Sequence, residues 1–154
     1  MTQEIDEANV RLVNKMQFVA QTGSGHAFVL DGAKGFGDDT GPRPMEVLLV
    51  GLAGCTGMDV AYILRKQKVE PEKFEVKVTG KRAESHPRIY TDIEIEYIVE
   101  GSNIQEKHLL KAIELSATKF CSASVMLGKS SRISHKYTLK NSSGEIKGEF
   151  TKEK

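Results

Sequence analysis

Cysteine is scarce in this chain, and the spacings that would place it in a metal site are missing. The 154 residues include two cysteines, Cys55 and Cys121, which stand far apart in the sequence. None of the four histidines lies in an HxxxH pattern, and no CxxC pair occurs. Two cysteines without such neighbours do not complete a zinc site. The sequence therefore predicts no metal centre.

An excess of one charge and a long unbroken apolar run are lacking as well. Lys plus Arg number 22 and Asp plus Glu 21, so we expect neither nucleic acid nor a membrane as partner. The first ten residues are acidic and polar, unlike a signal peptide. Residues such as Gly54 and Asp59 interrupt the most apolar stretch before it reaches about 18 residues. We therefore expect a cytoplasmic protein with reduced cysteines.

Hydrophobic alternation predicts the strands of one domain that spans residues 1–154. An N-terminal hairpin is expected at about 10–31, with 10–20 as its first strand, before a glycine-rich loop. A second hairpin is expected at about 73–100, and the final strands at about 131–150. Because these strands pair locally, we expect antiparallel sheets and an α+β fold.

Helices are predicted between these strands. The stretch of about 44–66 is apolar around nearly its whole circumference, which is typical of a long, central, buried helix. Second and third helices are expected within about 103–127, beginning at a capping box of Ser102 and Gln105. Since thin sheets cover such a central helix poorly, we expect a homodimer that packs it between subunits. A helix wrapped wholly by its own chain is the alternative.

The two cysteines are open to two interpretations. Cys55 lies in the central helix among three glycines, each of which costs about 1 kcal/mol there relative to alanine. Something therefore comes close, either another helix or a ligand that reaches the sulfur. Cys121 precedes a short helix whose N-terminus favours a thiolate, although a small apolar residue at a helix junction is also common. Spacing alone leaves both a redox couple and inert packing open.

A family resemblance lies in three segments, RPMEVLLVGLAGCTGMDVAYILRK, HPRIYTDIEIEY and KFCSASVML. Together they resemble the OsmC/Ohr family of osmotically inducible and organic hydroperoxide resistance proteins. The likeness covers nearly the whole chain in element order and is greatest to the OsmC-like branch, whose helix reads much like GLAGCTGMDV. It implies an OsmC-like fold and an intertwined homodimer with two active sites at the subunit interface. No metal, haem or flavin takes part.

The resemblance also implies a reaction. Cys55 is the peroxidatic nucleophile that becomes a sulfenic acid, and Cys121 condenses with it to a disulfide. A dithiol, in many members a lipoylated protein, restores the pair. We thus expect a thiol-dependent peroxidase. Organic hydroperoxides should be preferred because hydrocarbon tails gain by burial among the apolar residues expected near the site, which are Leu49, Leu52, Met58, Phe120 and Met126.

The sequence departs from the family pattern at the thiolate-stabilising residues. The resemblance implies a glutamate directly after the helix-starting proline, holding an arginine of the hairpin. Met45 stands there instead, and Glu46 follows one place on, turned by about 100°. Arg11 lies too early in the hairpin and Lys15 is its nearest cation, so Arg43 is the candidate substitute. Arg43 and Glu46 are either catalytic or solvated residues at the helix start.

These departures motivate an alternative function, a non-catalytic dimeric module that holds an apolar or thiol-bearing small molecule between subunits. Asp59, one helical turn beyond Cys55, would disfavour a thiolate there. We expect it to face the partner subunit or a cap.

Overall fold

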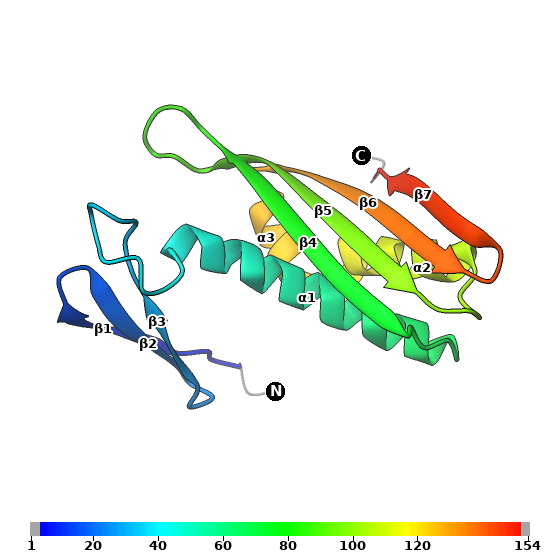
Figure 1. Ribbon diagram of the computed structural model, residues 1–154, viewed down its shortest axis with the longest axis horizontal. Coiled ribbons are helices and arrows are strands. Elements are labelled where there is room, and N and C mark those ends of the chain that lie inside the picture. Colours follow the sequence, from blue (N-terminus) through cyan, green and yellow to red (C-terminus); the bar gives the residue numbers. More distant parts are fainter. Residues whose placement is uncertain (1–3, 152–154) are drawn as a thin grey trace. The chain divides into compact units, whose positions relative to one another are not determined.

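The computed structural model describes residues 4–151 (Figure 1). The chain forms two compact units, which divide between Leu48 and Leu49. The prediction of one domain spanning residues 1–154 stays a prediction.

The first unit contains a three-stranded antiparallel sheet of β1 (Ala8–Asn14), β2 (Gln17–Thr22) and β3 (Ala27–Leu30), in that order. The prediction of one strand over 10–20 is wrong, because the chain turns at Lys15, where φ is 45°. The alternation continues through this turn because Leu12 and Phe18 are cross-strand partners. Directly opposed residues share a face of a sheet, so the turn leaves no break in the pattern.

The loop between β3 and the first helix is organised by Asp31. This buried carboxylate accepts hydrogen bonds from the Gly32 N–H at 2.7 Å, the Thr40 hydroxyl at 2.7 Å and the Thr40 N–H at 3.1 Å. The Thr40 hydroxyl is the main reason that the pKa of Asp31 is lowered. An ionised acceptor thereby holds the loop that leads into the first helix.

The second unit contains a four-stranded sheet in the order β4 (Lys73–Arg82), β5 (Tyr90–Glu100), β6 (Arg132–Asn141) and β7 (Gly144–Phe150). Its two hairpins confirm the strands predicted at 73–100 and 131–150. The expectation of purely antiparallel pairing is wrong for β5 and β6, which are parallel. A helical crossover joins them and returns the chain in the same direction, as parallel strands require. The α+β class is confirmed.

Within residues 4–151, the helical segments are α1 (Pro44–Lys66), α2 (Glu106–Leu115), the π-helical turn η1 (Ser116–Phe120) and α3 (Ser122–Leu127). The bounds of α1 agree with the prediction. The predicted capping box is wrong, because α2 begins only after Gln105. The backbone N–H of Gln105 donates to His108 Nδ1 at 3.2 Å, so the reciprocal cap lies three residues later than expected.

Burial of α1 is one-sided within this chain. Its buried residues form a stripe on one face: Leu52, Thr56, Val60, Ile63 and Leu64. Val50, Met58 and Tyr62 are exposed by 65%, 78% and 60%. The alternative of a helix wrapped wholly by its own chain is therefore wrong for these residues, and the burial of α1 between subunits stays a prediction. Among the described residues, α1 is also the one helix that is long and apolar enough to cross a membrane, a test that core helices of soluble proteins pass too.

Candidate functional site

The two cysteines meet in the second unit. Cys55 lies in α1, and Cys121 follows η1 and caps α3. Their Sγ atoms and a carboxylate oxygen of Asp59 all lie within 4.8 Å of one another. Both thiols are free; Cys55 is partly exposed, whereas Cys121 has 0% exposure. The structure thus brings the two predicted sulfurs together, and their roles stay predictions.

Burial controls the protonation of Cys121. It raises the pKa of this thiol to about 11, against the opposing influence of Ser124. The Ser124 N–H donates to Cys121 Sγ at 3.4 Å. The expectation that the start of α3 favours a thiolate at rest is therefore wrong, because loss of solvent outweighs the N-terminal turn of a six-residue helix.

Asp59 lies at the end of a chain of buried hydrogen bonds. Its Oδ2 accepts from Ser116 Oγ at 3.1 Å, and Ser116 Oγ lies 2.9 Å from Thr56 Oγ1. Thr56 Oγ1 lies 2.7 Å from the Tyr97 hydroxyl, which is 3.2 Å from His135 Nδ1. The Asp59 carboxylate also lies beside both sulfurs, and the expectation that this residue faces a partner or a cap stays a prediction.

Two local features of the sequence assemble this site. Asp59 follows Cys55 by four residues, so one helical turn places both side chains on the same face of α1. In η1, the Cys121 N–H donates to the Ser116 carbonyl at 2.9 Å, five residues back. This π-helical bond puts the Ser116 side chain and the Cys121 sulfur within reach of one residue, Asp59.

Sequence reasoning missed four of the hydrogen-bonding residues. Thr56 and Ser116 lie at positions that a helix pattern assigns to the core, while Tyr97 and His135 come from the parallel pair of β5 and β6. The sequence does show polar residues at inward-facing positions of apolar runs. This pattern does not indicate which of these residues form hydrogen bonds with one another.

The three clustered side chains also form a donor set of the kind that binds zinc. Thiolate sulfur and carboxylate oxygen are ordinary ligands of Zn²⁺, and Cys55, Asp59 and Cys121 offer three such atoms. No sequence motif indicated this set, because it joins a helical i, i+4 pair to a residue remote in the chain. The expectation that no metal takes part stays a prediction.

Arg43 and Glu46 meet each other in the first unit. Arg43 Nη1 lies 3.1 Å from Glu46 Oε1, and the Arg43 backbone N–H donates to Glu46 Oε2 at 3.0 Å. That N–H is the main reason that the pKa of Glu46 is lowered. Arg43 also pairs with Asp39 at 2.8 Å, and Lys15 pairs with Asp38 at 2.7 Å. Glu46 therefore pairs with an arginine, although it stands one residue later than the family pattern places its glutamate. The Arg43 side chain remains 40% exposed.

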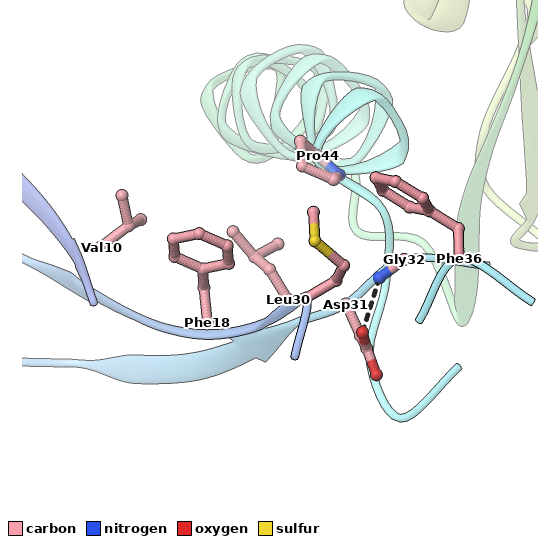
Figure 2. Close-up of a pocket in the computed structure, with 8 residues that line it drawn as sticks. Val10, Phe18, Leu30, Asp31, Gly32, Phe36 and Pro44 are labelled. Carbon is pink, nitrogen blue, oxygen red and sulfur yellow. Dashed lines mark hydrogen bonds between the residues drawn. The ribbon is translucent and has the colours of Figure 1, made fainter. Parts of the chain in front are cut away.

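An apolar pocket of about 350 Å³ lies in the first unit. Figure 2 shows Phe18 and Leu30 rising from their strands towards Pro44. Asp31 is the one charged residue in the lining, and its carboxylate is engaged by the Gly32 N–H. A pocket of this size and polarity suits a small apolar group. The lining consists of Val10, Met16, Phe18, Leu30, Asp31, Gly32, Phe36 and Pro44.

Known proteins resemble this chain in sequence and in structure. Residues 37–136 match the family model described as OsmC-like protein. Protein YhfA of Escherichia coli strain K12 is 37% identical over 131 residues, which cover 85% of this chain and 96% of YhfA. A hypothetical protein from Aquifex aeolicus VF5, known from a crystal structure, is 32% identical, with a TM-score of 0.81, covering 90% and 98% of the two chains.

A third relative links this fold to hydroperoxides by its name. The crystal structure of an organic hydroperoxide resistance protein OsmC from Legionella pneumophila has a TM-score of 0.65 and covers 88% of this chain and 97% of its own. At 11% sequence identity, this likeness establishes a shared fold and nothing finer.

Proposed function

Because this chain belongs to the OsmC-like protein family, we propose that it is a thiol-dependent peroxidase that reduces organic hydroperoxides. The proposal is carried by one observation, the placement of the Cys55 and Cys121 sulfurs within 4.8 Å of each other. Two thiols at that separation need only a small movement to reach the 2.05 Å or so of a disulfide. Proteins of the same fold that are named for organic hydroperoxide resistance support the substrate class.

The proposed reaction begins at Cys55. Its sulfur attacks the terminal peroxide oxygen, so that an S–O bond forms, the O–O bond breaks and an alcohol leaves. Cys121 then attacks the sulfenic sulfur, which forms the S–S bond and releases water. An external dithiol, such as a lipoylated protein, reduces the disulfide. The exposure of the two residues supports this order, because oxidant reaches the partly exposed Cys55 before the buried Cys121.

A homodimer is part of the proposal. The exposed apolar residues of α1 favour a second copy as the cover for this helix. A Cβ atom built at Gly51 or Gly54 meets nothing within 4 Å in the part of the chain that the structure describes, whereas one at Gly57 meets Val76. Close packing within the described part of the chain therefore explains the glycine at position 57, and not those at positions 51 and 54. We further propose that the dimer works in the cytoplasm, where cysteines are kept reduced.

Single-turnover kinetics with cumene hydroperoxide test the reaction. The wild type should consume one equivalent and form a Cys55–Cys121 disulfide. Cys121→Ser should consume one equivalent but accumulate a sulfenic acid that dimedone traps, while Cys55→Ser should be inert. Thr118→Ala, at an exposed position near Cys121, serves as the matched control and should behave as wild type. Equal consumption by wild type and Cys55→Ser would refute the peroxidase.

A second candidate function is favoured by the apolar pocket of the first unit. A non-catalytic dimeric module would hold an apolar or thiol-bearing small molecule, and Arg43, the candidate for stabilising a thiolate, is additionally paired with Asp39. Iodoacetamide separates the two functions. Alkylation of Cys55 no faster than that of free cysteine, together with no hydroperoxide consumption, would favour the binding module.

A further inference from the structure

We propose that Cys55, Asp59 and Cys121 form a binding site for Zn²⁺ in the reduced protein, and that the bound ion withholds both sulfurs from oxidants. Binding of the ion does not depend on the proposed function. The effect on hydroperoxide reduction rests on that function, because the same two sulfurs carry out the proposed reaction.

The three ligand atoms lie close to the geometry that zinc requires. They are within 4.8 Å of one another. In a tetrahedral site with Zn–S bonds of about 2.3 Å and a Zn–O bond of about 2.0 Å, neighbouring ligand atoms stand roughly 3.5 to 3.8 Å apart. Each pair of atoms therefore needs an approach of at most about 1.3 Å. Rotation of the Cys55 and Asp59 side chains, which share one face of α1, can supply it.

The donor types select the class of ion. Two cysteine sulfurs favour Zn²⁺ over Mg²⁺ and Ca²⁺, which bind through oxygen. Asp59 adds one oxygen to these two sulfurs. Cys55 and Asp59 are partly exposed, so water can reach a fourth position on the ion. Three protein ligands and one water differ from a closed structural zinc site, and we expect the ion to exchange.

Asp59 gains a role from this site that the disulfide chemistry does not give it. Within residues 4–151 its carboxylate accepts a hydrogen bond from Ser116 Oγ at 3.1 Å and makes no ion pair. A carboxylate beside two thiols opposes the formation of a thiolate on either sulfur, since like charges repel. A divalent cation among the three groups removes this conflict, because it attracts all of them.

Buried hydrogen bonds orient the carboxylate from outside the cluster. Ser116 Oγ contacts Asp59 and lies 2.9 Å from Thr56 Oγ1. Ser116 and Thr56 both have 0% exposure, so Asp59 is anchored to the core of the second unit. Ligating carboxylates are held by such outer partners, and loss of one costs about 10- to 100-fold in metal affinity.

Ser124 provides matching support at the Cys121 sulfur. Its N–H donates to Cys121 Sγ at 3.4 Å. Its hydroxyl is buried and, among the described residues, is the buried side-chain polar group without a hydrogen-bond partner. Burial raises the pKa of Cys121, and the Ser124 side chain opposes that effect, which places this hydroxyl near the sulfur. A zinc-bound thiolate accepts hydrogen bonds, so both groups of Ser124 can serve as its outer donors.

Binding transfers no electrons. Each thiol releases its proton to the solvent as its sulfur forms a bond to the ion, and the carboxylate adds a third bond. An S–S bond between the same cysteines leaves no thiolate to bind, so the disulfide form should release the ion. Zinc and hydroperoxide therefore compete for the same sulfurs, and the ion takes no part in the peroxide reaction itself.

Titration with Co²⁺ tests the site directly. Co²⁺ substitutes for Zn²⁺, and a bond from thiolate to Co²⁺ gives a near-ultraviolet charge-transfer band that a surface carboxylate or histidine cannot produce. The reduced, untagged wild type, kept free of oxygen, should develop this band up to one equivalent of Co²⁺ per chain. One equivalent of Zn²⁺ should abolish the band, whereas a large excess of Mg²⁺ should leave it unchanged.

Substitutions identify the ligands. Cys55→Ser and Cys121→Ser should each lose about half of the charge-transfer intensity or more, because each removes one of two sulfurs. Asp59→Asn should retain the band and bind Co²⁺ about 10- to 100-fold more weakly, and Ser116→Ala should bind it about tenfold more weakly with an unchanged spectrum. Glu114→Gln, which removes a carboxylate of α2 outside the cluster, is the control and should match the wild type.

Protection of Cys55 tests the consequence and requires no substitution. One equivalent of Zn²⁺ should slow its alkylation by iodoacetamide about tenfold or more, and a chelator should restore the rate. Wild type that has been alkylated at Cys55 should lose about half of the cobalt band or more. This measurement replaces the variants should Asp59→Asn fail to fold by circular dichroism.

The outcomes separate the site from the proposed function. No charge-transfer band in the reduced wild type would overturn the site, whatever the hydroperoxide assay gives. Full affinity in Asp59→Asn would overturn the role of its carboxylate as a ligand. A band together with no hydroperoxide consumption by the metal-free wild type would support the site and refute the peroxidase. In an active wild type, hydroperoxide consumption that one equivalent of Zn²⁺ leaves unchanged would overturn the withholding of the sulfurs.

Discussion

At the scale of single residues, solvent exposure gives the two thiols different chemistry. Cys55 is partly exposed in α1, whereas Cys121 is enclosed and has its pKa raised to about 11 by burial. A neutral buried thiol resists oxidation by solvent-borne oxidants. This asymmetry suits an attacking cysteine and a resolving cysteine better than two equivalent partners.

The raised pKa of Cys121 predicts a pH-dependent contribution to stability. The folded state holds the thiol proton more tightly than the unfolded state, whose thiol has the ordinary pKa near 9. The contribution is therefore complete below about pH 9 and is lost as the pH rises through about 11. In a Cys55→Ser background, the free-energy advantage of Cys121 over Cys121→Ser should shrink by on the order of 2 kcal/mol across this window.

Urea unfolding of the two variants from pH 8 to pH 11 measures that difference. The Cys55→Ser substitution prevents a disulfide in both variants. General alkaline destabilisation affects both variants equally, so it cancels in the difference between their unfolding free energies. An advantage that stays constant or grows with pH would contradict a raised pKa.

At the scale of elements, the π-helical turn η1 sets the position of Cys121. It accommodates one extra residue in a single wide turn between α2 and α3, closed by the Cys121 N–H bond to the Ser116 carbonyl. Such turns are often found at functional sites, where they redirect side chains that a regular helix would point elsewhere. Here η1 presents Ser116 to the Asp59 carboxylate and ends at the buried Cys121.

Insertion of one alanine after Thr118 should turn Cys121 away and separate the sulfurs. Thr118 is exposed, so the added residue takes nothing from the core. The turn η1 already accommodates one extra residue, so a further residue should rotate Cys121 by about 100°. We expect helical content to be kept by circular dichroism, and hydroperoxide-driven disulfide formation to fall at least tenfold by mass spectrometry of reduced and oxidised peptides.

The point substitution Thr118→Ala is the control for this insertion. It retains the length of η1 and should form the disulfide at the wild-type rate. Unchanged disulfide formation in the insertion variant would show that the register of η1 does not position Cys121.

At the scale of the whole molecule, one side of α1 exposes apolar side chains in the single chain. Val50, Met58 and Tyr62 expose large apolar surfaces that cost free energy in water, about 25 cal/mol per Å² left unburied. The opposite stripe of the helix is buried by packing within the chain itself. A second copy of the chain is the cover that we propose.

Light scattering coupled to size-exclusion chromatography tests the dimer. The wild type should elute with twice the mass of its 17.0 kDa chain. Val50→Glu should give a folded monomer, because the side chain is exposed in the single chain and its charge opposes only an apolar contact with a partner. Lys129→Glu, an exposed charge change outside α1, is the control and should remain dimeric. A wild type of single-chain mass would contradict the proposal.

The sequence by itself determined the bounds of α1, the strands β4 to β7 and the two cysteines. The apolar run after Pro44 and the basic residues before Pro71 predict the bounds of α1, because helix capping and proline act locally. Strand alternation predicts β4 to β7, since a half-buried sheet imposes a period of two. Cys55 and Cys121 were identified as a pair through the family resemblance.

Tertiary structure alone decided what surrounds those residues. Local pattern carries no information on which strands become parallel, so the pairing of β5 with β6 and the meeting of Tyr97 with His135 could not be predicted. The same holds for Asp59, whose helical position is local but whose hydrogen bond to Ser116 spans 57 residues of sequence. Burial, which sets the protonation of Cys121, is a property of the packed chain, because it depends on every element that excludes water from the sulfur.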